Sequence, residues 1–106
     1  MLDRIQASDF SHATGKICTL HLPDGTALPV LLEAVTVKEQ YRNPYAEEGT
    51  RLPFIANLVA QQPTEFVEGS CHFEFENGSR IDGIDVSRVA PLGRDPMVAY
   101  YQMVFS

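Results

Sequence analysis

The strongest fold signal in the chain is residues 69–87, GSCHFEFENGSRIDGIDVS. Apolar and polar residues alternate on both sides of Asn77-Gly78, as they do in strands that bury one face. Asn-Gly between two such runs favours a type I′ turn, because both residues tolerate positive φ. We therefore predict an antiparallel hairpin with strands at 69–76 and 79–87.

A second hairpin is predicted nearer the N-terminus. Residues 16–22 and 27–38 are strand-like and are separated by Pro23-Asp24-Gly25-Thr26, which is typical of a tight turn. Alternation in the second strand breaks at Val30-Leu31-Leu32, which fits either a β-bulge or a strand buried on both faces. Pro29 favours an edge position, since proline cannot donate to a neighbouring strand.

Two further strands are expected at 54–61 and 97–105, and a short helix at 8–14. The last strand would place five residues on one face: Met97, Ala99, Tyr101, Met103 and Phe105. Gly15 suits the left-handed exit of the helix, and Phe10 would plug one end of the sheet. Six strands separated by turn signals predict an all-β fold, an antiparallel barrel or sandwich with one short N-terminal helix.

Length and composition set the class of protein. A chain of 106 residues fits one domain, 1–106. The net charge of -6 argues against a nucleic-acid surface, because phosphate binding needs clustered Lys and Arg. No apolar run reaches the length of a membrane span, and the N-terminus lacks a signal-peptide pattern. We expect a protein that is cytoplasmic at synthesis and whose partners are other proteins or copies of itself.

The two cysteines, Cys18 and Cys71, share strand faces with Leu and Phe residues and are expected to point toward the core. Their simplest role is that of small buried hydrophobes. A disulfide between them stays open, since it requires Cα atoms closer than about 7 Å.

The metal candidates lie on one strand. His72, Glu74 and Glu76 alternate along it and could offer an imidazole and two carboxylates to a divalent cation. Two-residue spacing spreads ligands by roughly 6.5–7 Å, so a site would need His21 or Asp82 across the sheet. Otherwise this face is a solvated polar surface, and we expect neither a metal nor any other cofactor.

Catalytic residues are not predicted. Glu33 interrupts an apolar strand, so it is either a buried carboxylate with a shifted pKa or an exposed one paired with Arg80 or Arg88. Asp82-Gly83-Ile84-Asp85 lacks the spacing of a calcium loop. No nucleophile or phosphate-loop motif occurs.

The long polar connection at 39–53 is the candidate interaction loop, with Tyr41, Asn43 and Tyr45 as contact residues. Local packing of these tyrosines beneath the loop is the alternative.

A series of short motifs along the chain carries a family resemblance. Asp9-Phe10 leads to Gly15, Val67-Glu68-Gly69 precedes His72, and Tyr101-Gln102-Met103-Val104-Phe105 ends the series. The pattern resembles an uncharacterised family of bacterial β-domains of about this length, a domain of unknown function. The chain departs from that family at Val67-Glu68-Gly69-Ser70, where members tend to have a Gln-Gly-Thr turn, and at Gln102, where an acid is common.

The resemblance implies a genomic setting rather than a chemistry. Such genes often lie beside genes for phage-tail-collar-like proteins, which implies an accessory or assembly role in a tail-like particle, and the family defines no catalytic residues. We therefore expect a non-enzymatic protein-interaction or structural domain. The alternatives are a small β-barrel that binds a hydrophobic ligand or a metal ion, and an enzyme that uses Glu33 or His72.

Overall fold

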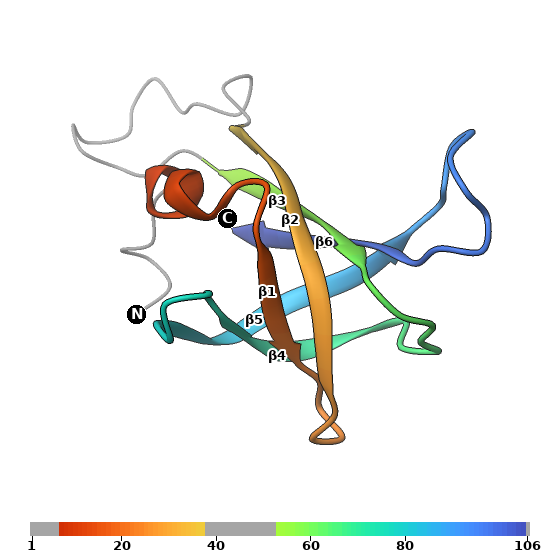
Figure 1. Cartoon of the computed structure of the whole chain (residues 1–106), viewed down its shortest axis with the longest axis horizontal. Coiled ribbons are helices and arrows are strands. Elements are labelled where there is room, and N and C mark those ends of the chain that lie inside the picture. Colours follow the sequence, from red (N-terminus) through yellow and green to blue (C-terminus); the bar gives the residue numbers. More distant parts are fainter. Residues whose placement is uncertain (1–6, 38–52, 106) are drawn as a thin grey trace.

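The computed structural model describes residues 7–37 and 53–105. These residues form a closed antiparallel barrel with strand order β1-β2-β3-β6-β5-β4, preceded by the 3-10 helix η2 (Figure 1). The elements are η2 (Ala7–Ala13), β1 (Ile17–His21), β2 (Ala27–Val37), β3 (Phe54–Ala60), β4 (Glu68–Glu74), β5 (Arg80–Val89) and β6 (Tyr100–Phe105). The predicted all-β barrel with one short N-terminal helix is thus confirmed, and the sandwich alternative is excluded.

Closure of the barrel corrects the expected edge position of Pro29. Strand β2 pairs with β1 on one side and β3 on the other, and Pro29 lies opposite Thr19 of β1. On the other side, the β2–β3 pairing ends at Val30↔Ala60, and the Pro29 carbonyl accepts a hydrogen bond from the Gln61 amide, at 2.9 Å. Proline is tolerated because it lies where this pairing ends.

The hairpin turn at Asn77-Gly78 is not type I′. That turn needs positive φ at both central residues, and in the described chain Leu92 is the one non-glycine residue with positive φ, while Gly78 has φ 92°. The Gly78 amide donates to the Phe75 carbonyl at 3.0 Å, and the Phe75 amide donates to the Ser79 carbonyl at 2.8 Å. The loop therefore has three residues, with a left-handed glycine at its end.

The β1–β2 hairpin uses the same construction. The Gly25 amide donates to the Leu22 carbonyl at 2.9 Å, and Gly25 has φ 91°. The residue before each glycine, Asp24 or Asn77, accepts a hydrogen bond with its side chain from the amide two positions on. This Asx contact favours the right-handed turn over the type I′ geometry at the Asx residue.

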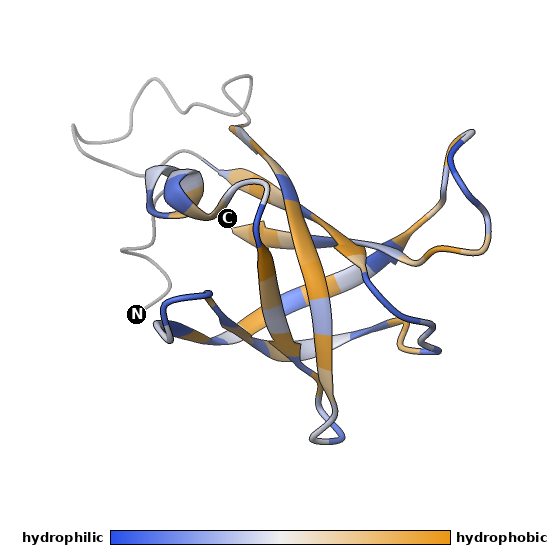
Figure 2. Ribbon diagram, viewed as in Figure 1, coloured by the Kyte–Doolittle hydropathy of each residue, from blue (hydrophilic) through white to orange (hydrophobic). Residues whose placement is uncertain are grey.

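Buried apolar side chains from all six strands fill the barrel interior. Figure 2 shows the corresponding change between hydrophobic and hydrophilic residues along the strands. Phe10 of η2 closes one end, where its ring lies 5.3 to 5.9 Å from the rings of Phe54, Phe73, Phe75 and Phe105. The apolar residues that could have lined a ligand cavity therefore form the core instead.

Both cysteine thiols are buried and free, so the expected core position is confirmed and no disulfide joins them. Burial raises the pKa of both thiols, that of Cys71 to about 11. A thiol of this kind is protonated at neutral pH and is a poor nucleophile.

Strand β6 begins at Tyr100, later than expected, and this removes Met97 from the buried face. Met97 is 86% exposed, whereas Ala99, Tyr101, Met103 and Phe105 are buried. The Asp95 side chain accepts a hydrogen bond from the Met97 amide at 2.9 Å, which holds this segment in a turn.

Within the described ranges, no helix is long and apolar enough to cross a membrane.

Candidate functional site

Glu33 lies at a β-bulge of β2. Leu32 pairs with Leu58 and Ala34 pairs with Asn57, so Glu33 has no partner of its own on β3. Burial alternates without a break through Leu28, Val30 and Leu32, so Leu31 is an apolar residue on the outer face, and the bulge follows at Glu33. It places the Glu33 carboxylate on the outer face of the barrel.

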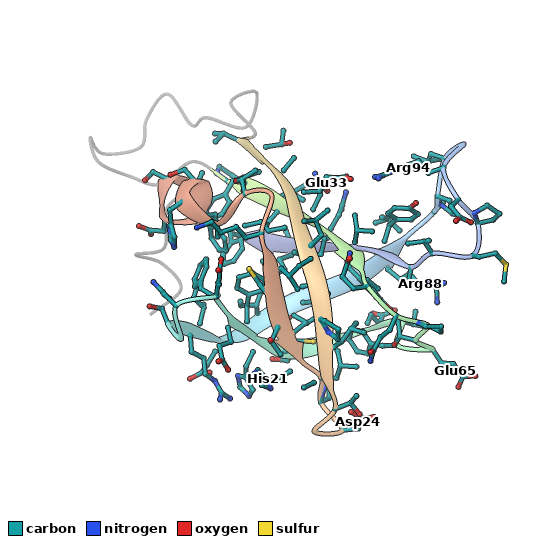
Figure 3. All side chains as sticks on the ribbon, viewed as in Figure 1. His21, Asp24, Glu33, Glu65, Arg88 and Arg94 are labelled. Carbon is teal, nitrogen blue, oxygen red and sulfur yellow. The ribbon has the colours of Figure 1, made fainter. Side chains whose placement is uncertain are left out.

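The partner of Glu33 is Arg94, not Arg80 or Arg88 as expected. Two guanidinium nitrogens of Arg94 donate to the two carboxylate oxygens, at 2.7 and 2.6 Å (Figure 3). The same guanidinium lies 4.3 Å from the centre of the Tyr100 ring. The hydrogen bonds from Arg94 hold the pKa of Glu33 below its usual value. A lowered pKa is the reverse of what a general acid needs.

This ion pair braces the connection between β5 and β6, residues 90–99. Arg94 lies within that connection, while Glu33 and Tyr100 belong to β2 and β6. A cleft of about 250 Å³ lies beneath it, lined in part by Glu33, Asn57 and Gln102. Figure 1 shows the loop projecting from the barrel at the right of the view. A bidentate ion pair and an aromatic contact hold the middle of the loop, at Arg94, against β2 and β6.

The β5–β6 loop exposes two large apolar side chains, one on each side of Arg94 in the chain. Leu92 is 89% exposed and has φ 49°, and Met97 is 86% exposed. A leucine in the left-handed region costs free energy that most residues avoid. These two are the most exposed of the large apolar side chains in the described residues.

A second bulge lies on β5. Cys71 pairs with Ile84 and Phe73 with Ile81, so Asp82 and Gly83 together lie opposite His72. Gly83 has φ 70°, a conformation that glycine adopts without strain. The Asp82 carboxylate lies 3.0 Å from His72 Nδ1 and 2.8 Å from Arg80 Nε. The hydrogen bond from Arg80 is the main cause of the lowered pKa of Asp82.

His21 lies directly across the sheet from His72 in the β1–β4 pairing. Its Nε2 lies 2.9 Å from Glu74 Oε1, whereas Glu76 lies 3.8 Å from Lys16 Nζ. The structure thus separates Glu76 from the other predicted metal candidates. No group of three or more His, Cys, Asp or Glu side chains in the described chain is arranged to hold a metal ion.

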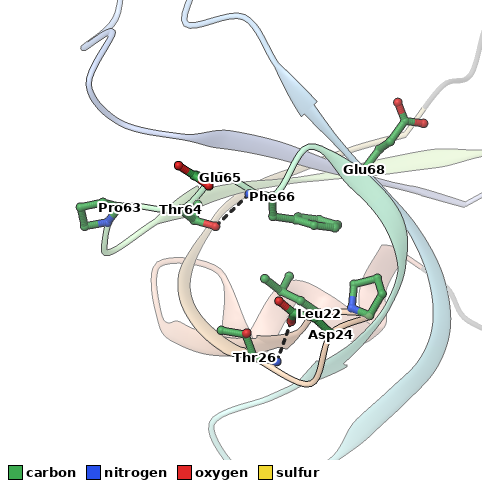
Figure 4. Close-up of a pocket in the computed structure, with 9 residues that line it drawn as sticks. Leu22, Asp24, Thr26, Pro63, Thr64, Glu65, Phe66 and Glu68 are labelled. Carbon is green, nitrogen blue, oxygen red and sulfur yellow. Dashed lines mark hydrogen bonds between the residues drawn. The ribbon is translucent and has the colours of Figure 1, made fainter.

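A larger pocket, of about 740 Å³, lies at the end of the barrel away from η2, between the β1–β2 turn and the β3–β4 connection (Figure 4). Leu22, Pro23 and Phe66 contribute its apolar lining, and Asp24 and Glu65 are among its polar residues. The buried Tyr101 hydroxyl donates to the Phe66 carbonyl at 2.6 Å and so ties the connection to β6. Burial raises the pKa of Tyr101.

The predicted interaction residues Tyr41, Asn43 and Tyr45 lie outside the described residues. Sequence reasoning missed Arg94, Leu92 and Met97 as site residues. Leu92 and Met97 flank Gly93-Arg94-Asp95-Pro96, a turn-rich stretch whose composition already predicted a loop. No sequence signal pairs Arg94 with Glu33. No family model, curated protein or solved structure matches this chain.

Proposed function

We propose that this domain works by binding another protein through the β5–β6 loop. The observation that carries the proposal is the exposure of Leu92 and Met97, at 89% and 86%, on a loop that the Glu33–Arg94 pair ties to β2. Apolar side chains that are held outward lose little conformational freedom on binding, so the burial of their surface contributes more fully to affinity.

The partner proposed from these features has an apolar groove for the two side chains and basic residues around it, because this chain carries a net charge of -6. The family resemblance adds the proposal that this partner is a component of a tail-like particle. Self-association through the same loop is the competing outcome.

Photo-crosslinking in the native cell tests the loop directly. A photoreactive amino acid at position 92 or 97 should give a covalent adduct with one partner protein, which mass spectrometry identifies. Position 17 is the matched control, because Ile17 is 48% exposed but lies at the start of β1. Failure of positions 92 and 97 to give any adduct would overturn the proposal.

Purified protein then separates the two kinds of partner. An adduct with a second copy, together with a dimer in light scattering that Leu92→Asp dissolves, would replace the proposed partner by self-association. An adduct with a tail component would support the assembly role. Leu92→Asp should weaken binding to that component without changing the far-ultraviolet circular dichroism.

A second candidate function, the binding of a small ligand, is favoured by the pocket at the β3–β4 end. Its volume of about 740 Å³ lies in the range of ligand sites, and Phe66 is available there for contact with an apolar group. Amide chemical shifts of Phe66 and Thr26 during a small-molecule screen would test it. Shift changes confined to the β5–β6 loop would argue against this pocket.

A further inference from the structure

Two histidines lie side by side on the outer face of the barrel, where β1 pairs with β4. His21 and His72 are direct partners in that pairing, and their chain neighbours Leu20 and Phe73 point into the core. Both imidazoles therefore leave the same outer face, with Cβ atoms about 4.5–5.5 Å apart. Their side chains are 26% and 43% exposed, so an ion from solvent can reach both rings.

Each imidazole has a carboxylate at one ring nitrogen. His21 Nε2 lies 2.9 Å from Glu74 Oε1, and His72 Nδ1 lies 3.0 Å from Asp82 Oδ1. The Gly83 amide is also placed to donate to His72 Nδ1, at 3.4 Å, but the Asp82 carboxylate lies closer to that nitrogen, at 3.0 Å, and favours a proton on it. Among the residues described, none makes a hydrogen bond or ion pair with the remaining ring nitrogens, His21 Nδ1 and His72 Nε2.

This arrangement is the one that prepares imidazoles for metal binding. A carboxylate at one ring nitrogen fixes the tautomer and raises the basicity of the other nitrogen, which becomes the ligand. The bulge at Asp82-Gly83 provides that carboxylate for His72, and Glu74 of β4 provides it for His21.

We propose that His21 and His72 bind a divalent transition-metal ion such as Zn²⁺, with water completing the coordination. Imidazole nitrogen suits Zn²⁺, Ni²⁺ and Cu²⁺, whereas Mg²⁺ and Ca²⁺ prefer oxygen ligands. Glu74 and Asp82 orient the rings and are not ligands, which agrees with the lack of a three-residue metal cluster in the described chain. The site is independent of the β5–β6 loop and of the proposed protein binding.

The positive charge of Arg80 should weaken the binding of a metal ion at this site. Its guanidinium binds Asp82 at 2.8 Å and brings a positive charge close to the His72 ring. Substitution Arg80→Gln should therefore tighten metal binding, an effect that a purely structural role of these residues does not produce.

Calorimetric titration of the purified chain with Zn²⁺ tests the proposal. We expect one ion per chain, no heat with Mg²⁺, and reversal by a chelator. His21→Gln and His72→Gln should each abolish binding, whereas His12→Gln should leave it unchanged, because His12 lies on η2 beside Phe75. Equal binding by wild type, His21→Gln and His72→Gln would overturn the site, as would the absence of binding at millimolar Zn²⁺.

Two further measurements test the proposal even if His21→Gln or His72→Gln folds poorly. Glu74→Gln and Asp82→Asn keep both imidazoles and should weaken binding by about tenfold or more. In wild type, saturating Zn²⁺ should raise the melting temperature, since an ion that binds only the folded chain stabilises it. Unchanged affinity in both carboxylate variants would show that these groups do not prepare a site.

Discussion

The two β-bulges of the described barrel both present an acidic side chain on the outer face, yet the two acids act differently. At the β2 bulge, Glu33 gives both carboxylate oxygens to Arg94 and fixes a loop. At the β5 bulge, Asp82 is shared between Arg80 and His72, and the His72 ring keeps one nitrogen exposed for other contacts. At the β2 bulge both carboxylate oxygens are used by one ion pair, whereas at the β5 bulge the His72 ring can still bind a further group. The difference shows that an irregular strand position acquires its role from the residue brought opposite it.

The largest expected effect comes from the β5 bulge itself. Gly83→Val places a β-branched side chain at φ 70°, which should cost about 1–3 kcal/mol of the free energy of unfolding. Urea denaturation measures the loss. Asp85→Val is the matched control on the same strand, where valine is favoured. Equal stability of the Gly83→Val variant and wild type would mean that the bulge does not need its glycine.

Cys71 pairs with Ile84 beside the same bulge, so its thiol reports on local packing. Its folded-state pKa of about 11 lies above the ordinary 9.0, so the folded state holds this proton more tightly. The resulting stability is present below pH 9.0 and is lost as the pH rises toward 11. We expect no alkylation of the native thiol in mildly alkaline buffer and rapid alkylation in urea, with Gly83→Val in between. Rapid labelling of the native wild type would show that the thiol is accessible.

At the β2 bulge, Glu33→Gln should release the β5–β6 loop with little change in global stability. The neutral amide loses the charge of the bidentate pair while keeping its size. Faster amide exchange across residues 90–99, with β4 unchanged, is the expected result. Gln102→Glu adds a carboxylate to the same cleft without touching Glu33 and is the control.

Acid should have the same effect as the Glu33 substitution. Because the folded-state pKa of Glu33 lies below its ordinary 4.5, the ion pair contributes stability above that pH and loses it as the pH falls through the lowered pKa. Amide shifts of Arg94 followed on acidification check this. A midpoint at or above 4.5 would contradict it.

The smallest effect is expected at Leu92 of the β5–β6 loop. Leu92→Gly relieves the strain at φ 49° but adds freedom to the unfolded chain, so the two changes should nearly cancel, to within about 1 kcal/mol. Gly83 and Leu92 both have positive φ, but only Gly83 is the residue type that this conformation favours. Comparing the two substitutions therefore measures how much stability depends on glycine at such a position.

The sequence predicted the parts of the fold that depend on neighbours in the chain. Both hairpins and the inward faces of Cys18 and Cys71 follow from alternation and turn residues. The pairing of His21 with His72 depends on the register of strands far apart in the chain, and Arg94 is separated from Glu33 by 61 residues. Local patterns do not encode such contacts, so the Glu33–Arg94 pair could not be predicted, and His21 could be named only as a conditional partner of His72 across the sheet. The tight turn at 23–26 was predicted correctly, whereas the turn at Asn77-Gly78 was mispredicted as type I′, because Asn-Gly also suits a right-handed turn that ends in a left-handed glycine.

The strand order has a consequence for how the chain reaches this structure. Four of the pairings join strands that are consecutive in the chain, while β3–β6 and β1–β4 join distant ones. Consecutive pairs lose little entropy on meeting, so they should assemble early, and the distant pairs should form last. The β1–β4 ladder contains three residue pairs, fewer than any other ladder in the described barrel. We therefore expect the β1–β4 pairing, which contains His21 and His72, to form at the end of folding. We also expect it to open first during native-state fluctuations.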